Sequence, residues 1–134
     1  MKYLTPQKVL FIHDQVVKRT GGSLGIRDIG LVESAVYRPQ ASFGGKDLYK
    51  NVFDKSAALL QSLLKNHPFI DGNKRTALTS SGLFLRLNGY KLINAKKEEV
   101  EFAIRVDNQH LNIEEISKWL KKNSKKISEI TTGS

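Results

Sequence analysis

The residues best suited to chemistry lie together in the segment His67–Thr76, which reads His-Pro-Phe-Ile-Asp-Gly-Asn-Lys-Arg-Thr. Histidine is the side chain that exchanges protons near neutral pH, so His67 is the candidate general base. Asp71 offers a carboxylate of the kind that holds Mg²⁺, an ion commonly bound by one or two carboxylates together with nucleotide phosphates. A base and a metal ligand so close in sequence favour phosphate chemistry.

The second half of this segment has the features of a phosphate site. A helix predicted to begin near Asn73 would present free backbone N–H groups and the positive end of its dipole to an anion. Gly72 would let the backbone approach a phosphate closely. Asn73, Lys74 and Arg75 add donors and positive charge, which is unfavourable at a helix N-terminus unless a polyanion binds there. The pattern is not a Walker A loop, which requires Gly-x-x-x-x-Gly-Lys-Ser/Thr.

Each part of the segment also has a purely structural interpretation. A histidine at a helix end is often structural, Asp-Gly-Asn alone is typical of a turn, and Lys-Arg alone is typical of a surface. Phe69 and Ile70 are predicted to be core residues under any hypothesis. His13 and His110 lack a spacing for metal binding and are interpreted as structural or surface residues. The residues alone therefore support a nucleotide site and an ordinary loop about equally.

The periodicity of apolar residues predicts that the segment joins two buried helices. The helix before it is expected to cover residues 51–65. The helix after it is expected at residues 73–87, with apolar side chains around much of its circumference, and Asn88-Gly89 would end it. Further helices are predicted at residues 6–19, at residues 28–37, from a cap at Asn94 to residue 107, and from a capping box at Asn112 through residue 120.

The predicted fold class is all-α, in one compact domain. Gly44-Gly45 between Phe43 and Leu48 is compatible with one small β-hairpin, and an ordinary glycine-rich connector fits the spacing equally well. The domain is expected to cover residues 1–124. Residues 125–134 are expected to be a disordered basic and polar tail.

The composition limits the class of protein. The chain has 134 residues, which suits one domain, and no cysteine, which excludes disulfides, thiolate zinc sites and a cysteine nucleophile. Its formal net charge of +9 favours an anionic partner such as a nucleotide, a nucleic acid or an acidic protein surface, although part of that charge is a lysine cluster near the C-terminus. No apolar run approaches the about 18 residues of a membrane span, so a soluble, cytoplasmic protein is expected.

The segment from His67 to Arg75 closely resembles the signature of the Fic/Doc (Fido) family, His-x-Phe-x-Asp/Glu-Gly/Ala-Asn-x-Arg. Residues 73–78, Asn-Lys-Arg-Thr-Ala-Leu, are similar to the death-on-curing (Doc) toxin branch of that family, and so are residues 25–36, 38–45 and 87–90. The resemblance extends over residues 3–122.

This resemblance implies a small helical bundle with the signature in a loop and at the start of the next helix. It also implies transfer of part of ATP to a hydroxyl group of a protein, with His67 as the general base and Asp71 as the ligand of Mg²⁺. The segment 38–48 would be a flap that holds the extended backbone of the target. The residues implied to bind the nucleotide phosphates are Gly72, Asn73, Lys74 and Arg75.

Two positions distinguish the reactions of the family. Members that transfer AMP have glycine where this chain has Lys74 and a second arginine where it has Leu78, whereas Doc-like members share both departures. The resemblance therefore implies an ATP- and Mg²⁺-dependent protein Ser/Thr kinase that phosphorylates a translation elongation factor of the Tu type and arrests translation. A Fic-type protein adenylyltransferase is the alternative, and a non-catalytic binding module is a second alternative.

The control of this activity also has a sequence signature. Many Fic enzymes carry an inhibitory helix with the pattern Ser/Thr-x-x-x-Glu-Gly/Asn, yet no glutamate of this chain has serine or threonine four residues before it. The resemblance implies that a separate antitoxin protein inhibits the chain, through a segment that folds onto it. Direct binding of nucleic acid is not expected.

Overall fold

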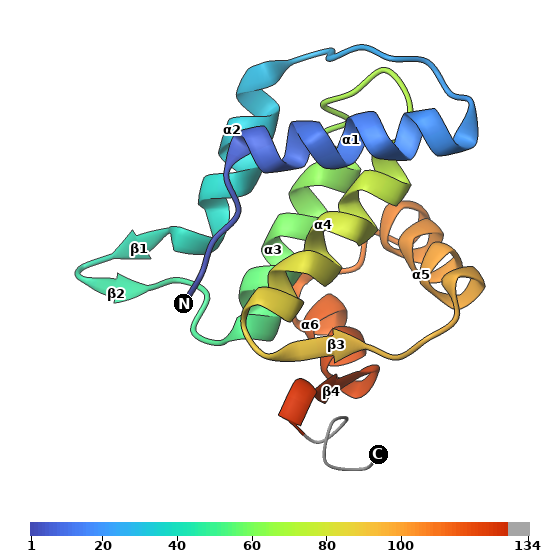
Figure 1. Ribbon diagram of the computed structural model, residues 1–134. Coiled ribbons are helices and arrows are strands. Elements are labelled where there is room, and N and C mark those ends of the chain that lie inside the picture. Colours follow the sequence, from blue (N-terminus) through green and yellow to red (C-terminus); the bar gives the residue numbers. More distant parts are fainter. Residues whose placement is uncertain (129–134) are drawn as a thin grey trace.

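The computed structural model describes residues 1–128, which form a mostly helical domain with two small pairs of strands (Figure 1). Every helix that the sequence predicts is present. In chain order the elements are α1 (Pro6–Thr20), α2 (Ile29–Tyr37), the 3₁₀ helix η1 (Arg38–Gln40), β1 (Ser42–Phe43), β2 (Lys46–Asp47), α3 (Val52–Lys65), α4 (Asn73–Leu87), β3 (Tyr90–Leu92), α5 (Lys96–Asn108), α6 (Ile113–Lys122) and β4 (Ser124–Lys126).

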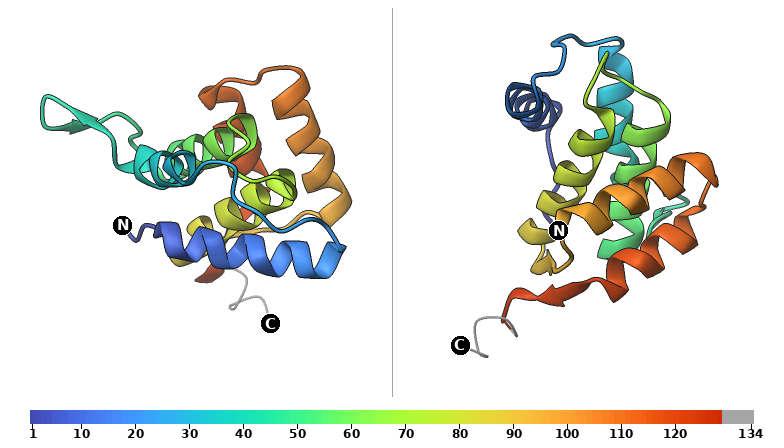
Figure 2. Two further views of the ribbon diagram at one scale, coloured as in Figure 1. Left: turned by 90° about the horizontal axis from the view of Figure 1, so that it is seen from above. Right: turned by 90° about the vertical axis from the view of Figure 1, so that its right-hand side faces the viewer.

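Helices α3 and α4 form the centre of the molecule. They pack against each other, with α2 and α6 against α3 and with α1 and α5 against α4 (Figure 2). Ser56 and Ser81 are fully buried where the two central helices meet, and the Ser56 hydroxyl donates to the Ser81 carbonyl at 3.2 Å. Because α4 is central, its first turn, which contains the candidate phosphate site, has a rigid support.

The apolar circumference predicted for α4 is only partly buried. Phe84 and Leu85 belong to the core, whereas Leu83 is half-buried and Leu87 is 41% exposed. Small residues that the sequence pattern did not single out, such as Ala77, fill the rest of the buried face and allow close packing against α3.

Side-chain caps account for the start of several helices. Thr5 accepts the backbone N–H of Lys8 at 3.2 Å ahead of α1. Asn112 and Glu115 form the predicted capping box of α6. Asn94 does not cap α5, which begins after Ala95: its amide nitrogen donates to Glu98 and to Asn123, and its side-chain oxygen accepts no backbone N–H of the helix.

Residues 42–47 form a hairpin and not a simple connector. Gly44 and Gly45 have φ values of 59° and 78°, the left-handed conformation that a tight two-residue turn requires. The preceding Arg38 keeps helical dihedral angles although it comes before a proline, because its guanidinium is fixed by Tyr49, Gln61 and Ser62. Tertiary hydrogen bonds therefore outweigh the bias against helical dihedral angles in the residue before a proline.

Strand β4 is an element that the sequence pattern did not predict. It pairs with β3 in antiparallel register, with Leu92 opposite Ser124 and Tyr90 opposite Lys126. Residues 125 and 126, expected to begin a disordered tail, are thus ordered by backbone pairing, which lysine side chains do not prevent. Residues 129–134 of the predicted tail lie outside the described residues, and the domain boundary stays a prediction. Among the described helices none is long and apolar enough to cross a membrane.

The hairpin and the loop 66–72 lie at opposite ends of α3 (Figure 1). The hairpin precedes the first residue of α3, and the loop follows its last one. This helix has 14 residues and is therefore about 21 Å long at 1.5 Å per residue. The view from above shows the hairpin projecting away from the body of the domain (Figure 2).

Candidate active site

All six candidate site residues line one cavity of about 390 Å³ at the start of α4. Thr20 from the end of α1, Gly22 and Ile70 complete its wall. The candidate residues brought together there are His67, Asp71, Gly72, Asn73, Lys74 and Arg75. The grouping expected from the sequence is therefore present in the fold, while the chemical role of each residue stays a prediction.

A strap of residues 25–28 holds the loop from outside. Ile26 forms an antiparallel bridge with Phe69, and the backbone N–H of Ile70 donates to the Gly25 carbonyl at 3.2 Å. A Cβ on Gly25 would lie 2.6 Å from Cδ1 of Ile70, and its φ of 143° is unfavourable for other residues. The strap can run so close to the loop only because residue 25 is glycine.

His67 has a backbone conformation that non-glycine residues rarely adopt, with a φ of 48°. The guanidinium of Arg27 donates to the carbonyl oxygens of both Asn66 and His67 and so holds this conformation. The imidazole of His67 is exposed at the wall of the cavity. An imidazole is thus presented to any molecule that enters the cavity.

The Asp71 carboxylate is fixed in place at the wall of the same cavity. One oxygen accepts the backbone N–H of Gly72 at 2.8 Å, and the other accepts that of Ser23 at 3.1 Å. Gly22 leaves room for it, because a Cβ there would lie 2.5 Å from Asp71 Oδ2. The carboxylate remains exposed and keeps free lone pairs.

These features fit a magnesium ion better than a metal held by protein alone. No group of three or more potential ligands occurs among the described residues. Mg²⁺ does not need one, since it commonly takes one or two carboxylates and completes its shell with phosphate oxygens and water. Asp71 is the residue that would hold it.

The start of α4 offers free donors. Gly72, with a φ of 78°, precedes the helix without a side-chain cap. Within the described part of the chain, the backbone N–H groups of Asn73, Lys74 and Arg75 donate no hydrogen bond. The predicted anion site at the helix N-terminus is therefore open to a ligand.

Asn73 has a different role from the one that the sequence suggested for its side chain. Its amide closes the loop by accepting the Phe69 N–H at 3.0 Å and donating to the Phe69 carbonyl at 2.9 Å. Both polar groups of the Asn73 side chain are thus bonded to Phe69, and only its main-chain N–H is left to bind a phosphate.

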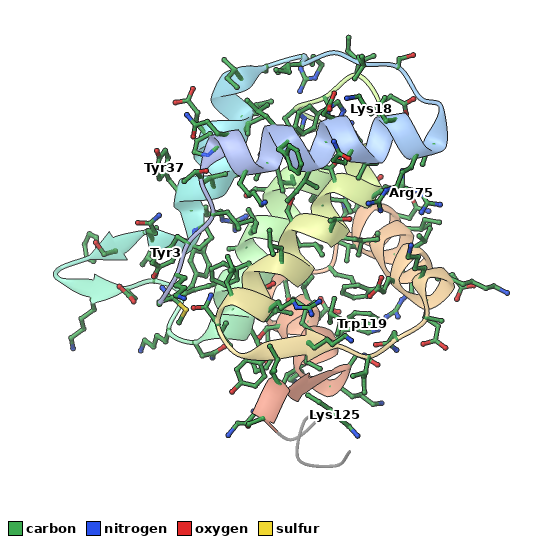
Figure 3. All side chains as sticks on the ribbon, viewed as in Figure 1. Tyr3, Lys18, Tyr37, Arg75, Trp119 and Lys125 are labelled. Atoms are coloured by element: carbon green, nitrogen blue, oxygen red, sulfur yellow. The ribbon has the colours of Figure 1, made fainter. Side chains whose placement is uncertain are left out.

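Both cations of the first turn line the cavity of His67, and Arg75 reaches a second cavity as well. Lys74 is exposed and lines the cavity of His67, whereas Arg75 also lines a neighbouring cavity of about 310 Å³ between α1, α4 and α5 (Figure 3). Leu78 and Glu99 face that second cavity. Burial raises the pKa of the Glu99 carboxyl, and the attraction of Lys96 opposes this effect. Leu78 thus lines this second cavity and not the one lined by His67.

One expectation about the surrounding residues needs correction. Phe69 is buried as predicted, but Ile70 is 63% exposed, because its side chain lies over Gly25 at the rim of the cavity. The segment 38–48, expected to be a flap that holds the target, lines no part of this cavity, and its role as a flap stays a prediction. Its last residue, Leu48, borders a separate depression of about 1030 Å³ at the other end of α3.

Sequence reasoning missed two residues that hold the loop, namely Arg27 and His13. His13 is 4% exposed, and its Nε2 lies 2.8 Å from the Asp71 carbonyl oxygen. A signal was present in the sequence, since His13 lies beside Ile12 and close to Val16 on the apolar stripe of its helix. A polar ring in such a place needs a buried partner.

Comparison with known proteins identifies one matching family and two similar proteins. A family model described as "Fic/DOC family" matches residues 3–85. A protein named "Toxin Doc" from Mycolicibacterium smegmatis is 54% identical over 72 residues, which are 54% of this chain and 55% of that protein. "Protein kinase doc" from Escherichia phage P1 is 36% identical over 95 residues, which are 71% of this chain and 75% of that protein. The aligned part thus spans about half of the mycobacterial relative.

Proposed function

This chain belongs to the Fic/DOC family, and from that premise we propose that it is a Doc-type toxin that acts as a protein kinase. It transfers the γ-phosphoryl group of ATP to a Ser or Thr hydroxyl of a translation elongation factor of the Tu type. One observation carries the proposal: a base, a carboxylate and an uncapped helix N-terminus line the same cavity. The names of the two relatives support the kinase and the toxin assignments.

The phosphates of ATP bind at the first turn of α4. The free N–H groups of Asn73, Lys74 and Arg75 donate to phosphate oxygens, and the Lys74 and Arg75 side chains neutralise their charge. Mg²⁺ at Asp71 would supply further charge neutralisation for the transferred group.

His67 acts as the general base for the protein hydroxyl. Its imidazole accepts the hydroxyl proton while the hydroxyl oxygen forms a bond to the γ-phosphorus. The bond from that phosphorus to the oxygen bridging the β- and γ-phosphates breaks, and ADP leaves. Such a reaction depends mainly on positioning and charge stabilisation, which a rigid loop provides.

A protein substrate and a separate protein inhibitor belong with this activity. A folded translation factor is large enough to contact both the cavity and the hairpin, and such a target places the reaction in the cytoplasm. A separate antitoxin inhibits the chain, consistent with the absence of the inhibitory sequence pattern among its glutamates.

The test uses ATP labelled either at the γ- or at the α-phosphate, with the purified elongation factor as substrate. We expect label on the factor only from the γ-position, and none with His67→Ala or Asp71→Asn. His110→Gln is the matched control, because this histidine contacts Lys65 and no residue of the cavity. Transfer of the α-label would instead establish the AMP transferase. Growth arrest that persists in both site variants would establish a binding module.

A further inference from the structure

His13 joins α1 to the backbone of the candidate metal ligand. Its Nε2 lies 2.8 Å from the backbone carbonyl oxygen of Asp71, so the ring donates an N–H to that oxygen. Its ring also stacks on Phe69, with centroids 3.7 Å apart and planes inclined by 7°. One imidazole thus contacts the loop at two residues that flank Ile70.

The surroundings of His13 leave little freedom at this contact. The ring is 4% exposed, so its donor cannot be replaced by water at low cost. A Cβ on Gly72 would already lie 3.4 Å from Cγ2 of Val17 and 3.7 Å from Cδ2 of His13. The peptide that carries Asp71 is therefore packed directly onto α1.

The carboxylate of Asp71 depends on the position of this peptide. Its two oxygens are oriented by the N–H groups of Ser23 and Gly72. The first belongs to the loop after α1, and the second is part of the same peptide unit that His13 binds. A shift of the Asp71 carbonyl would therefore change both distances together.

We propose that His13 is a positioning residue that places the Asp71 carboxylate for its metal ion, by holding the Asp71 carbonyl and the Phe69 ring. The inference rests on the proposed function, because it takes Asp71 as the magnesium ligand. It assigns to α1 a part in metal binding through His13, a residue that does not itself line the cavity of Asp71. Outer residues that orient a metal ligand typically change metal affinity by about 10- to 100-fold when they are replaced.

Two substitutions separate the hydrogen bond from the stacking. His13→Phe keeps an aromatic ring against Phe69 but removes the donor to Asp71. His13→Gln keeps an amide N–H where the ring donated and removes the stack. His110→Gln serves as the control histidine, since it lies outside the cavity and binds Lys65.

The measurement is the affinity for Mn²⁺, by electron paramagnetic resonance, in the presence of a non-hydrolysable ATP analogue. We expect His13→Phe to weaken Mn²⁺ binding about tenfold or more, and His13→Gln to restore most of it. Thermal unfolding of each variant accompanies the binding data. A role in packing alone predicts a lower Tm for His13→Gln with unchanged Mn²⁺ affinity in both variants, and that result would overturn the inference.

The Mn²⁺ affinities test the role of His13 whether or not phosphoryl transfer is observed. Wild-type protein that transfers γ-label while His13→Phe binds Mn²⁺ normally contradicts the role of His13 alone. Wild-type protein that transfers no label contradicts the proposed function, and the Mn²⁺ affinities still decide the role of His13.

Discussion

The Arg27 guanidinium holds the backbone of His67, with Nε donating to the His67 carbonyl oxygen at 2.6 Å. The same side chain donates from Nη2 to the carbonyl of Asn66. His67 has a φ of 48°, a conformation that persists only where neighbouring groups stabilise it. A residue 40 positions away in the sequence thus fixes the direction in which the proposed base faces.

Replacing Arg27 with alanine is expected to slow phosphoryl transfer by about 10- to 100-fold, because a small displacement of a catalytic group has an effect of this size. Arg27→Lys should be intermediate, since lysine lacks the two-pronged geometry. Initial rates with γ-labelled ATP measure the effect. Arg105→Ala, an exposed arginine of α5, is the control. Equal rates for Arg27→Ala and wild type would contradict the role of this contact.

Lys55 is a buried cation at the base of the hairpin, 1% exposed, and donates to Pro39 O at 2.9 Å and to Asp47 at 3.2 Å. Lys55→Met removes both bonds and leaves the Pro39 carbonyl without this donor, at a cost of about 1–3 kcal/mol. Urea unfolding measures this change. The hairpin should also become more sensitive to proteolysis, and a variant as stable and as resistant as wild type would exclude this role.

The same residue gives a prediction for alkaline pH. Burial lowers the pKa of Lys55, but its interactions with Tyr3 and Asp47 outweigh burial and raise the pKa above the ordinary 10.5. A raised pKa stabilises the fold fully below the unfolded-state value, and this stabilisation is lost as pH rises through the folded-state value. The Tm difference between wild type and Lys55→Met should be constant near neutral pH and shrink above about pH 10.4.

Removing the charge of Glu99 is expected to stabilise the fold, whereas removing the charge of Lys55 is expected to destabilise it. Burial raises its pKa, so the folded state binds the proton more tightly than the unfolded state and stability falls as pH rises through the carboxyl range. Glu99→Gln should therefore have a higher Tm than wild type at pH 7, and the gain should vanish below about pH 4.3. The exposed Glu101→Gln is the control. A lower Tm for Glu99→Gln at pH 7 would refute the assignment.

The central place of α4 is tested by two apolar residues of the helix that differ in burial. Phe84 is 1% exposed, so Phe84→Ala should cost about 3–5 kcal/mol in the free energy of unfolding. Leu87 is 41% exposed, and Leu87→Ala should change stability by no more than about 1 kcal/mol. Urea unfolding of both variants makes the comparison. Similar losses for the two would mean that α4 is not the buried core helix.

Local signals in the sequence were sufficient for the helices. Thr5-Pro6 and the Asn112–Glu115 box mark helix starts through contacts within one turn, and these contacts form as expected. Strand β4 could not be predicted in this way, because it depends on backbone pairing with a distant segment, and its sequence Ser124–Lys126 has no apolar alternation.

The sequence predicts which residues line the candidate site but not which residues hold them in place. The signature residues are contiguous in sequence, so their grouping in one cavity follows once the loop folds. The contacts of His13 and Arg27 join residues 58 and 40 positions apart, and no local pattern encodes such partners. The distance of the hairpin from the cavity likewise depends on the direction of α3, which local spacing does not specify.

The placement of the hairpin and the cavity at opposite ends of one helix makes the molecule modular. Substitutions in residues 42–47 can change what the hairpin contacts while the loop 66–72, anchored by α1 and the strap, keeps its geometry. Selection can therefore change what such a protein recognises without changing the loop that carries its chemistry. Chimeras that exchange only the hairpin are a practical route to altered recognition.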